Sequence, residues 1–170
     1  GMESMPSESV CYPAKLAHGH IESLIEQGIK TIFYPCMPYS RKEYEKADNK
    51  YNCPIVISYS EVIRNNVEDL KKNKIKFINP FLPFDCKNLV KKIMELDEFK
   101  EYNFTKQELI EAAKKAEAEY QKCKEDIRNK GKETVRYIEE NNLKGIVLAG
   151  RPYHIDPEIN HGIDTLITSL

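Results

Sequence analysis

Three cysteines with neighbouring prolines are the residues of this chain whose chemistry is most specific. They are Cys11, Cys36 and Cys53, and each has a proline within two residues. Thiolates are soft ligands that select iron–sulfur clusters, zinc or copper(I). A structural zinc site usually has four ligands with closely spaced cysteine pairs, and the sequence has no C-x-x-C motif. A set of three cysteines fits a cubane iron–sulfur cluster better, with one iron left open.

The alternative is that these cysteines only pack inside the domain, since free cysteine is among the most buried residue types. That interpretation suits Cys86, near the start of a predicted helix, and Cys123, at an apolar position of a long predicted helix. We predict that both are structural. The odd cysteine count argues against a simple disulfide framework. The N-terminal residues lack the basic and apolar regions of a signal peptide, so we expect a cytoplasmic protein, in which thiols stay reduced.

The elements that must position these thiols alternate along the first hundred residues. Apolar spacing predicts a helix over residues 15–26, and β-prone runs predict strands at 30–34, 54–59 and 75–78. A further helix is expected through residues 89–96, with either Asp85 or Asn88 as its N-cap residue. This rhythm predicts an α/β fold, a parallel-sheet Rossmann- or flavodoxin-like lobe with helices on both faces. Since loops at the carboxyl ends of parallel strands converge, we expect the three thiols to meet at one edge of the sheet.

The second half of the chain has a different pattern. Residues 105–141 predict a long amphipathic helix or a pair of helices that opens with a capping box, with Gly131 as the place for a break or kink. Residues 145–150 are typical of a buried strand, and a helix is expected from residue 158 to the end. We therefore divide the chain into three predicted parts. They are a cysteine-bearing α/β lobe (2–103), a long helical bridge (104–142) and the first β-loop-α unit of a second, truncated α/β lobe (143–170).

Composition and charge exclude several classes of function. The 170 residues are 41% hydrophobic and 31% charged, as in a globular protein. The formal net charge of −1 gives no electrostatic reason to expect nucleic acid or an anionic membrane as a partner. No run of apolar residues is long enough to span a bilayer. We expect no nucleic-acid partner and no membrane association.

Five other residues are candidates for binding or for supporting a cluster. Lys15 and His18 lie just beyond the first cysteine and suit an anion or a cluster sulfide; the alternative is that they are solvated or cap a turn. Tyr39 begins a charged loop that is expected to close over the site. Arg151 suits a phosphate, such as that of coenzyme A, and His154 suits proton transfer. Both lie in a strand-to-helix loop, where α/β folds place ligand groups; the alternative is a rigid turn.

Four longer segments carry a family signature. They are ESVCYPAKLAHGH (8–20), FYPCMPY (33–39), NCP (52–54) and LAGRPYHIDPEINHG (148–162). Together they resemble the acyl-CoA dehydratase activase-related family. That family is similar to the iron–sulfur (D) component of 2-hydroxyacyl-CoA dehydratases, such as the 2-hydroxyglutaryl-CoA enzyme. The resemblance implies a [4Fe-4S] cluster on Cys11, Cys36 and Cys53, which is expected to be lost in an aerobic preparation.

The same resemblance implies a redox module for ATP-driven electron transfer in anaerobic metabolism. In the dehydratases, an ATPase activator passes a low-potential electron to the cluster, and the 2-hydroxyacyl-CoA loses its hydroxyl group. The implied partners are an ATPase activator domain, on the same or a separate chain, and a CoA thioester. If the domain is an enzyme, it is a lyase of this type or its activating electron-transfer component. Two alternatives stay open: a non-redox acyl-CoA-binding or protein-interaction domain with structural cysteines, and a zinc protein.

Overall fold

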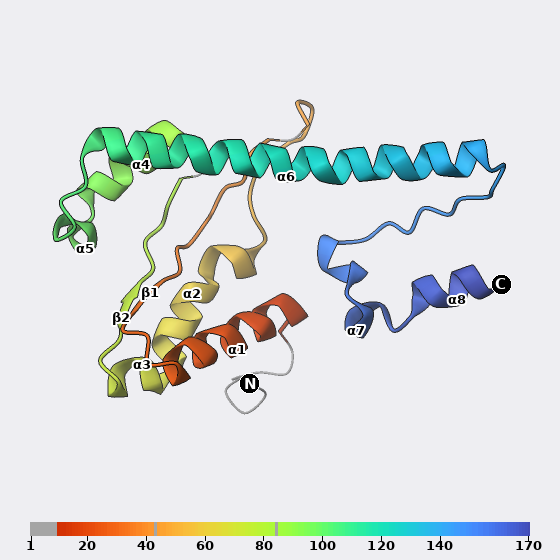
Figure 1. Ribbon diagram of the computed structural model, residues 1–170. Helices are drawn as coiled ribbons and strands as arrows, with labels where there is room; N and C mark the ends of the chain where they lie inside the picture. Colours follow the sequence, from red (N-terminus) through yellow and green to blue (C-terminus); the bar gives the residue numbers. More distant parts are fainter. Residues whose placement is uncertain (1–9, 43, 84) are drawn as a thin grey trace. The chain divides into compact units, whose positions relative to one another are not determined.

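The structure is a computed structural model that describes residues 10–42, 44–83 and 85–170 (Figure 1). The chain divides into two compact units, Gly1–Ala118 and Glu119–Leu170. The start of the predicted first lobe, residues 2–9, lies outside the described residues. In chain order the elements are α1 (Tyr12–Glu26), β1 (Thr31–Phe33), α2 (Pro54–Asn66), α3 (Glu68–Lys72), β2 (Lys76–Ile78), α4 (Cys86–Glu95), α5 (Asp97–Lys100), α6 (Lys106–Glu140), the 3-10 helix η2 (Pro152–Ile155), α7 (Pro157–Asn160) and α8 (Ile163–Ser169).

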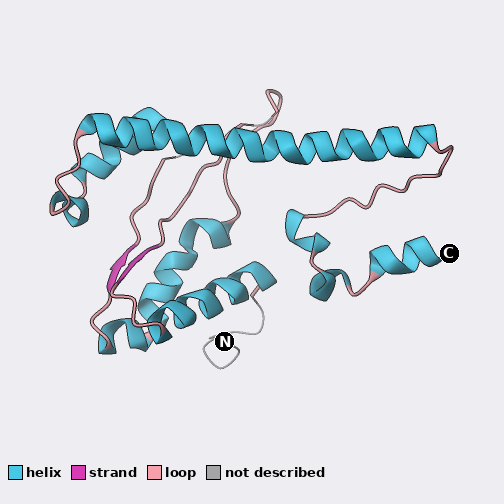
Figure 2. Cartoon of the chain, viewed as in Figure 1, coloured by secondary structure: helices cyan, strands magenta, loops and turns pink. Residues whose placement is uncertain are grey.

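Two short parallel strands form the sheet of the first unit (Figure 2). β1 pairs with β2 so that Ile32 lies opposite Phe77, and α2 and α3 make the crossover between them. Beyond the strands, the two backbone segments continue side by side as far as a parallel bridge between Cys36 and Phe81. The strands predicted at 30–34 and 75–78 are confirmed.

Helices α1 and α2 pack against each other and build the core of this unit. The helix predicted at 15–26 is confirmed as α1. After the end of α1, Gly28 has a backbone φ angle of 76°, a left-handed conformation that favours glycine. The buried residues of the core come from both helices, from β1, from the linker residue before α3 and from α3 itself: Ala14, Ile21, Ile32, Tyr59, Ile63, Val67 and Leu70.

The strand predicted at 54–59 is wrong, because this segment forms the first half of α2. Proline is tolerated at the first position of a strand and also at the first turn of a helix, so Pro54 did not distinguish the two. Ile55, Tyr59 and Ile63 are four residues apart and all pack into the core, which is the helical period. The described residues therefore form a helix-rich α/β structure with a two-stranded parallel sheet. A full Rossmann-like lobe is not confirmed.

The helices after the sheet follow their predicted caps. Asp85 accepts a hydrogen bond from the Asn88 amide and begins α4. Thr105 and Glu108 form the predicted capping box of α6, because the Glu108 carboxylate accepts from the Thr105 amide at 2.8 Å. The long predicted helix is confirmed, and it continues through Gly131 without a break. Within the described ranges, no helix has the length and apolarity needed to cross a membrane.

The second unit departs from its prediction after α6. Residues 145–150 are not a strand, and Val147 is 92% exposed. A strand needs a hydrogen-bonded neighbour, and the described part of this unit contains no other strand. The helix expected from residue 158 is present as α7 and α8. They are separated because His161 and Gly162 have left-handed φ angles of 52° and 74°.

Candidate metal centre

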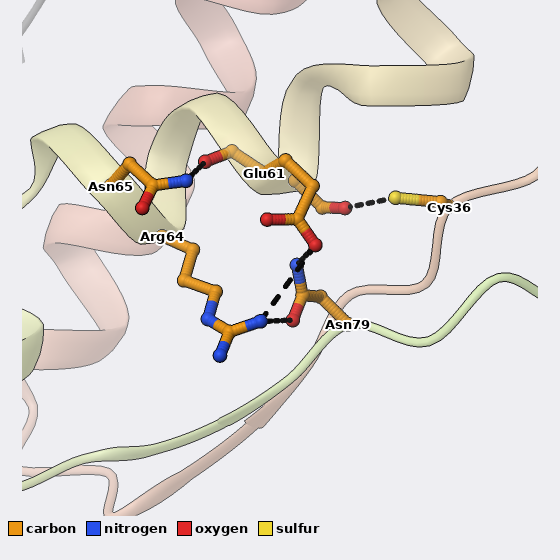
Figure 3. Close-up of polar contacts among 6 residues, drawn as sticks. Cys36, Glu61, Arg64, Asn65 and Asn79 are labelled. Carbon is orange, nitrogen blue, oxygen red and sulfur yellow. Dashed lines mark hydrogen bonds and ion pairs between the residues drawn. The ribbon is translucent and has the colours of Figure 1, made fainter.

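Cys36 lies just beyond β1 and is held by backbone and side chain. Its amide donates to the Pro80 carbonyl at 2.9 Å, and its carbonyl accepts from the Leu82 amide at 3.0 Å. Its side chain is fully buried, with Sγ 2.8 Å from the Ser60 Oγ of α2 (Figure 3). Because both the backbone and the sulfur are engaged, Cys36 has one well-defined position.

A polar network on α2 fixes the other side of this junction (Figure 3). The buried Asn79 donates to the Glu61 carboxylate at 2.8 Å and accepts from Arg64 at 3.4 Å. Asn79 directly precedes Pro80, whose carbonyl accepts the Cys36 amide. The network therefore ties α2 to the chain that holds Cys36.

The loop between Cys36 and α2 is closed by hydrogen bonds between its last and first residues. Asn52 donates through its amide to the Pro38 carbonyl at 3.0 Å. Its side-chain Nδ2 donates to the Met37 carbonyl at 2.7 Å. Because Met37 follows Cys36 and Asn52 precedes Cys53, these two bonds join the backbone segments of two predicted site cysteines.

Cys11 and Cys53 occupy equivalent positions, each as the N-cap residue of a helix. Cys11 begins α1 and Cys53 begins α2, and each helix has a proline in its first turn. Figure 1 shows the first turns of the two helices on the same side of the pair that they form. Both cysteines are exposed. Each of these cysteines therefore stands at the amide end of a helix, which carries partial positive charge.

A pair of buried polar side chains lies between α1 and α2. His18 is 0% exposed, and its ring meets that of Tyr59 edge to face, with ring centroids 5.5 Å apart. Neither ring nitrogen of His18, nor the Tyr59 hydroxyl, has a hydrogen-bond partner among the residues that the structure describes. The alternative expectation that His18 is solvated is therefore wrong. Its burial follows from the helical spacing of Ala14, His18 and Ile21, which all lie on the core face of α1.

Burial shifts the titration of both side chains. Desolvation lowers the pKa of His18, which favours the neutral imidazole. Desolvation also raises the pKa of Tyr59, and the neighbouring charges of Tyr34 and Cys11 raise it further. Desolvation, with Cys36 as a second cause, raises the pKa of Tyr34. The hydroxyls of Tyr59 and Tyr34 thus lie within electrostatic range of two of the three predicted ligands.

Tyr39 lies in the loop between Cys36 and Cys53. It forms an antiparallel bridge with Tyr51, and the two ring centroids are 4.9 Å apart. The hydrogen bond with Tyr51 raises the pKa of Tyr39. Arg41 in the same loop forms an ion pair with Glu117 of α6. This loop borders a pocket of about 380 Å³ lined by Tyr39, Ser40, Arg41, Lys42, Lys50, Pro83 and Asp85.

The predicted residues of the second unit form a local turn. The Arg151 amide donates to Nδ1 of His154 at 3.1 Å, and the His154 amide donates to the Arg151 carbonyl at 2.8 Å. A Cβ at Gly150 would lie 2.5 Å from the same Nδ1, so a side chain there would displace the imidazole. The imidazole of His154 therefore satisfies a backbone group, as the rigid-turn alternative expects.

The structure brings the predicted ligands into one unit without assembling a finished site. In residues 10–42, 44–83 and 85–170, no three His, Cys, Asp or Glu side chains are grouped closely enough to hold a metal ion. Lys15 is half-buried in the first turn of α1. Cys123 is exposed on α6, so the prediction that it packs in a core is wrong. The side chain of Cys86 lies outside what the structure describes.

Two residues with clear contacts to the site were missed from the sequence. They are Ser60, which contacts the Cys36 sulfur, and Asn79, which supports the Cys36 backbone. The four-residue spacing of Ile55, Tyr59 and Ile63 was the signal that would have revealed α2 and placed Ser60 on its buried side.

The family assignment follows from comparison with known proteins. Residues 1–170 match the family model described as CoA enzyme activase uncharacterised domain. No curated protein and no solved structure matches the chain. This family model covers the whole chain and agrees with the resemblance that the segments 8–20, 33–39, 52–54 and 148–162 carry. The chain therefore belongs to the acyl-CoA dehydratase activase-related family, and its role is linked to the activation of a CoA enzyme.

Proposed function

We propose that this domain is an iron–sulfur redox module that holds a [4Fe-4S] cluster on Cys11, Cys36 and Cys53. The observation that carries the proposal is the way in which the first unit ties their backbones together. Cys36 lies at the end of the parallel pairing, and Asn52, the residue before Cys53, donates to the carbonyl of Met37, the residue after Cys36. Cys11 begins the helix that packs against α2. Binding requires the exposed thiols of Cys11 and Cys53 to turn toward Cys36.

The chemistry of the surrounding groups fits an anionic sulfur cluster. Two helix N-termini supply partial positive charge beside Cys11 and Cys53. The buried Tyr59 hydroxyl lacks an acceptor among the described residues, and a buried hydroxyl without a partner costs about 1–3 kcal/mol. Cluster sulfides and thiolates are acceptors for such a donor. The orphaned hydroxyl near Cys11 is therefore accounted for by an acceptor that arrives with the cluster.

The proposed role is single-electron transfer in an ATP-driven activation system. An iron–sulfur cluster supplies one-electron transfer at a potential that its hydrogen bonds and exposure set. The proposed partners are an ATPase activator domain, a CoA dehydratase component and a CoA thioester. A cytoplasmic location and anaerobic metabolism are part of the same proposal. The chain's own residues bind and orient the cluster, and the packed α1–α2 core excludes water from one side of it.

The test is anaerobic reconstitution with iron and sulfide. We expect about four iron and about four sulfide per chain, and a brown protein with broad visible absorption. Single Cys→Ser substitutions at positions 11, 36 and 53 should each lose most of the colour. Cys123→Ser is the matched control, because Cys123 is exposed on α6 and should leave iron content unchanged. Iron well below four per chain in the colourless wild-type protein would refute the cluster. Equal iron content in all four variants would refute its ligation by Cys11, Cys36 and Cys53.

One observation favours a second candidate, an acyl-CoA-binding domain with structural cysteines. The pocket of about 380 Å³ beside Tyr39 contains Lys42 and Lys50, cations that suit phosphate groups. This candidate predicts binding of a CoA thioester that is unchanged when Cys11, Cys36 and Cys53 are all replaced by alanine. Tight stoichiometric zinc without colour would instead identify the third alternative, a zinc site.

A further inference from the structure

The hydroxyl of Ser60 contacts a cysteine sulfur and not a carbonyl of its own helix. Serine hydroxyls inside helices usually bond the carbonyl four residues earlier, and Ser58 on the same helix does so, donating to the Pro54 carbonyl at 2.9 Å. Ser60 instead lies 2.8 Å from the Cys36 sulfur, across the junction between α2 and the end of β1. Both side chains are buried, with Ser60 1% exposed. Water therefore does not compete for this contact.

The state of the sulfur decides which atom donates. In a hydrogen bond between a thiol and a hydroxyl at this distance, either group can be the donor. A metal-bound cysteine is a thiolate and has no proton to give. If Cys36 ligates the cluster, the Ser60 hydroxyl must donate to its sulfur.

We infer that Ser60 is a positioning residue whose hydrogen bond to the Cys36 sulfur raises the reduction potential of the cluster. This inference rests on the proposed function. Hydrogen bonds to the sulfurs are one of the terms that set cluster potentials. A donor stabilises the more negative, reduced state more than the oxidised state, because the bond strengthens as the acceptor gains charge.

The contact is rigid at both of its ends. Cys36 is fixed by its two backbone bonds to Pro80 and Leu82. Ser60 is followed by Glu61, which Asn79 holds through a 2.8 Å bond (Figure 3).

The experiment compares midpoint potentials of reconstituted variants under anaerobic conditions. Ser60→Ala should keep its iron and sulfide, while the equilibrium for reduction shifts about tenfold toward the oxidised cluster, or about 59 mV lower for one electron. Ser58→Ala is the matched control, because its hydroxyl bonds only local backbone on an exposed face, and its potential should equal that of the wild type. Equal potentials for Ser60→Ala and wild type would overturn the inference.

A second pair of variants keeps the test decisive if Ser60→Ala does not retain the cluster. Ser60→Thr and Ser60→Val have nearly the same shape and differ by one hydroxyl. Ser60→Thr should lie near the wild-type potential and Ser60→Val below it, whereas equal potentials would refute the role of the hydroxyl. A wild-type protein that takes up no cluster would defeat the proposed function itself. Loaded proteins with unchanged potentials would defeat only the inference about Ser60.

Discussion

Replacing Tyr59 by phenylalanine tests whether its buried hydroxyl lacks a partner. The Tyr59 ring packs in the α1–α2 core and is 4% exposed, and its hydroxyl makes no hydrogen bond within the described residues. A buried hydroxyl without a bond costs about 1–3 kcal/mol. Phenylalanine keeps the ring and its edge contact with His18 and removes that cost. We therefore expect the cluster-free Tyr59→Phe protein to be more stable than the wild type by about 1 kcal/mol.

The assay is urea unfolding of the cluster-free protein under reducing conditions. With a slope of about 2 kcal/mol per molar urea, a gain of about 1 kcal/mol moves the midpoint up by about 0.5 M. Tyr137→Phe, on the exposed surface of α6, is the control and should stay within about 0.5 kcal/mol of the wild type. A midpoint for Tyr59→Phe that falls by 0.5 M or so would show that the hydroxyl is bonded, and would refute the reasoning.

The same variant should behave differently once reconstituted. If the cluster supplies the acceptor that Tyr59 lacks, the hydroxyl then makes a favourable bond and phenylalanine loses it. The stability gain seen without the cluster should shrink or reverse with it. An identical gain in both forms would remove Tyr59 from the account of the cluster environment.

Two further substitutions test the neighbouring supports. Asn79→Ala should lower the free energy of unfolding by about 1–3 kcal/mol, because it leaves the Glu61 carboxylate without its buried donor. Asn65→Ala, at an exposed position, is the control. Equal losses of stability in the two variants would contradict the role of Asn79. For His18, burial holds the folded pKa below the ordinary 6.5, so the unfolded chain binds a proton that the fold excludes. Stability should therefore be greatest above that pH and fall as pH drops below about 6.5, by at most about 1.4 kcal/mol per pH unit. His18→Leu should flatten this slope, and an unchanged slope in urea unfolding would disprove it.

Elements with strong local signals could be predicted from the sequence. Asp85 and the Thr105–Glu108 pair mark helix starts because their side chains bond amides that the helix leaves free. Gly28 marks a helix end because its backbone angle favours glycine. These signals involve residues only a few positions apart, so no knowledge of the tertiary fold is needed to read them.

The segments that failed depend on distant neighbours. Residues 54–59 are rich in β-branched side chains, yet packing against α1 selects the helix. Residues 145–150 are apolar enough for a buried strand, but a strand forms only beside another, and the described part of the second unit supplies none. In both cases tertiary context decided between two conformations that the local sequence allows.

The candidate site was predictable in its residue types but not in its supports. The cysteine–proline pattern identifies thiols near the ends of elements, and two of them cap helices. The bonds from Asn52 to Met37 and from Ser60 to Cys36 join residues 15 and 24 positions apart. Such contacts follow from the path of the loop and the register of the sheet, which no local pattern encodes.

The cysteine assignment is tested most directly by Mössbauer spectroscopy of protein reconstituted with the iron-57 isotope. Three thiolates leave one iron of a cubane with a different ligand, so the spectrum should contain two kinds of iron site in a ratio of about three to one. Cys123→Ser should give the same spectrum. Four equivalent iron sites, or no cluster signal in protein prepared without oxygen, would contradict ligation by Cys11, Cys36 and Cys53.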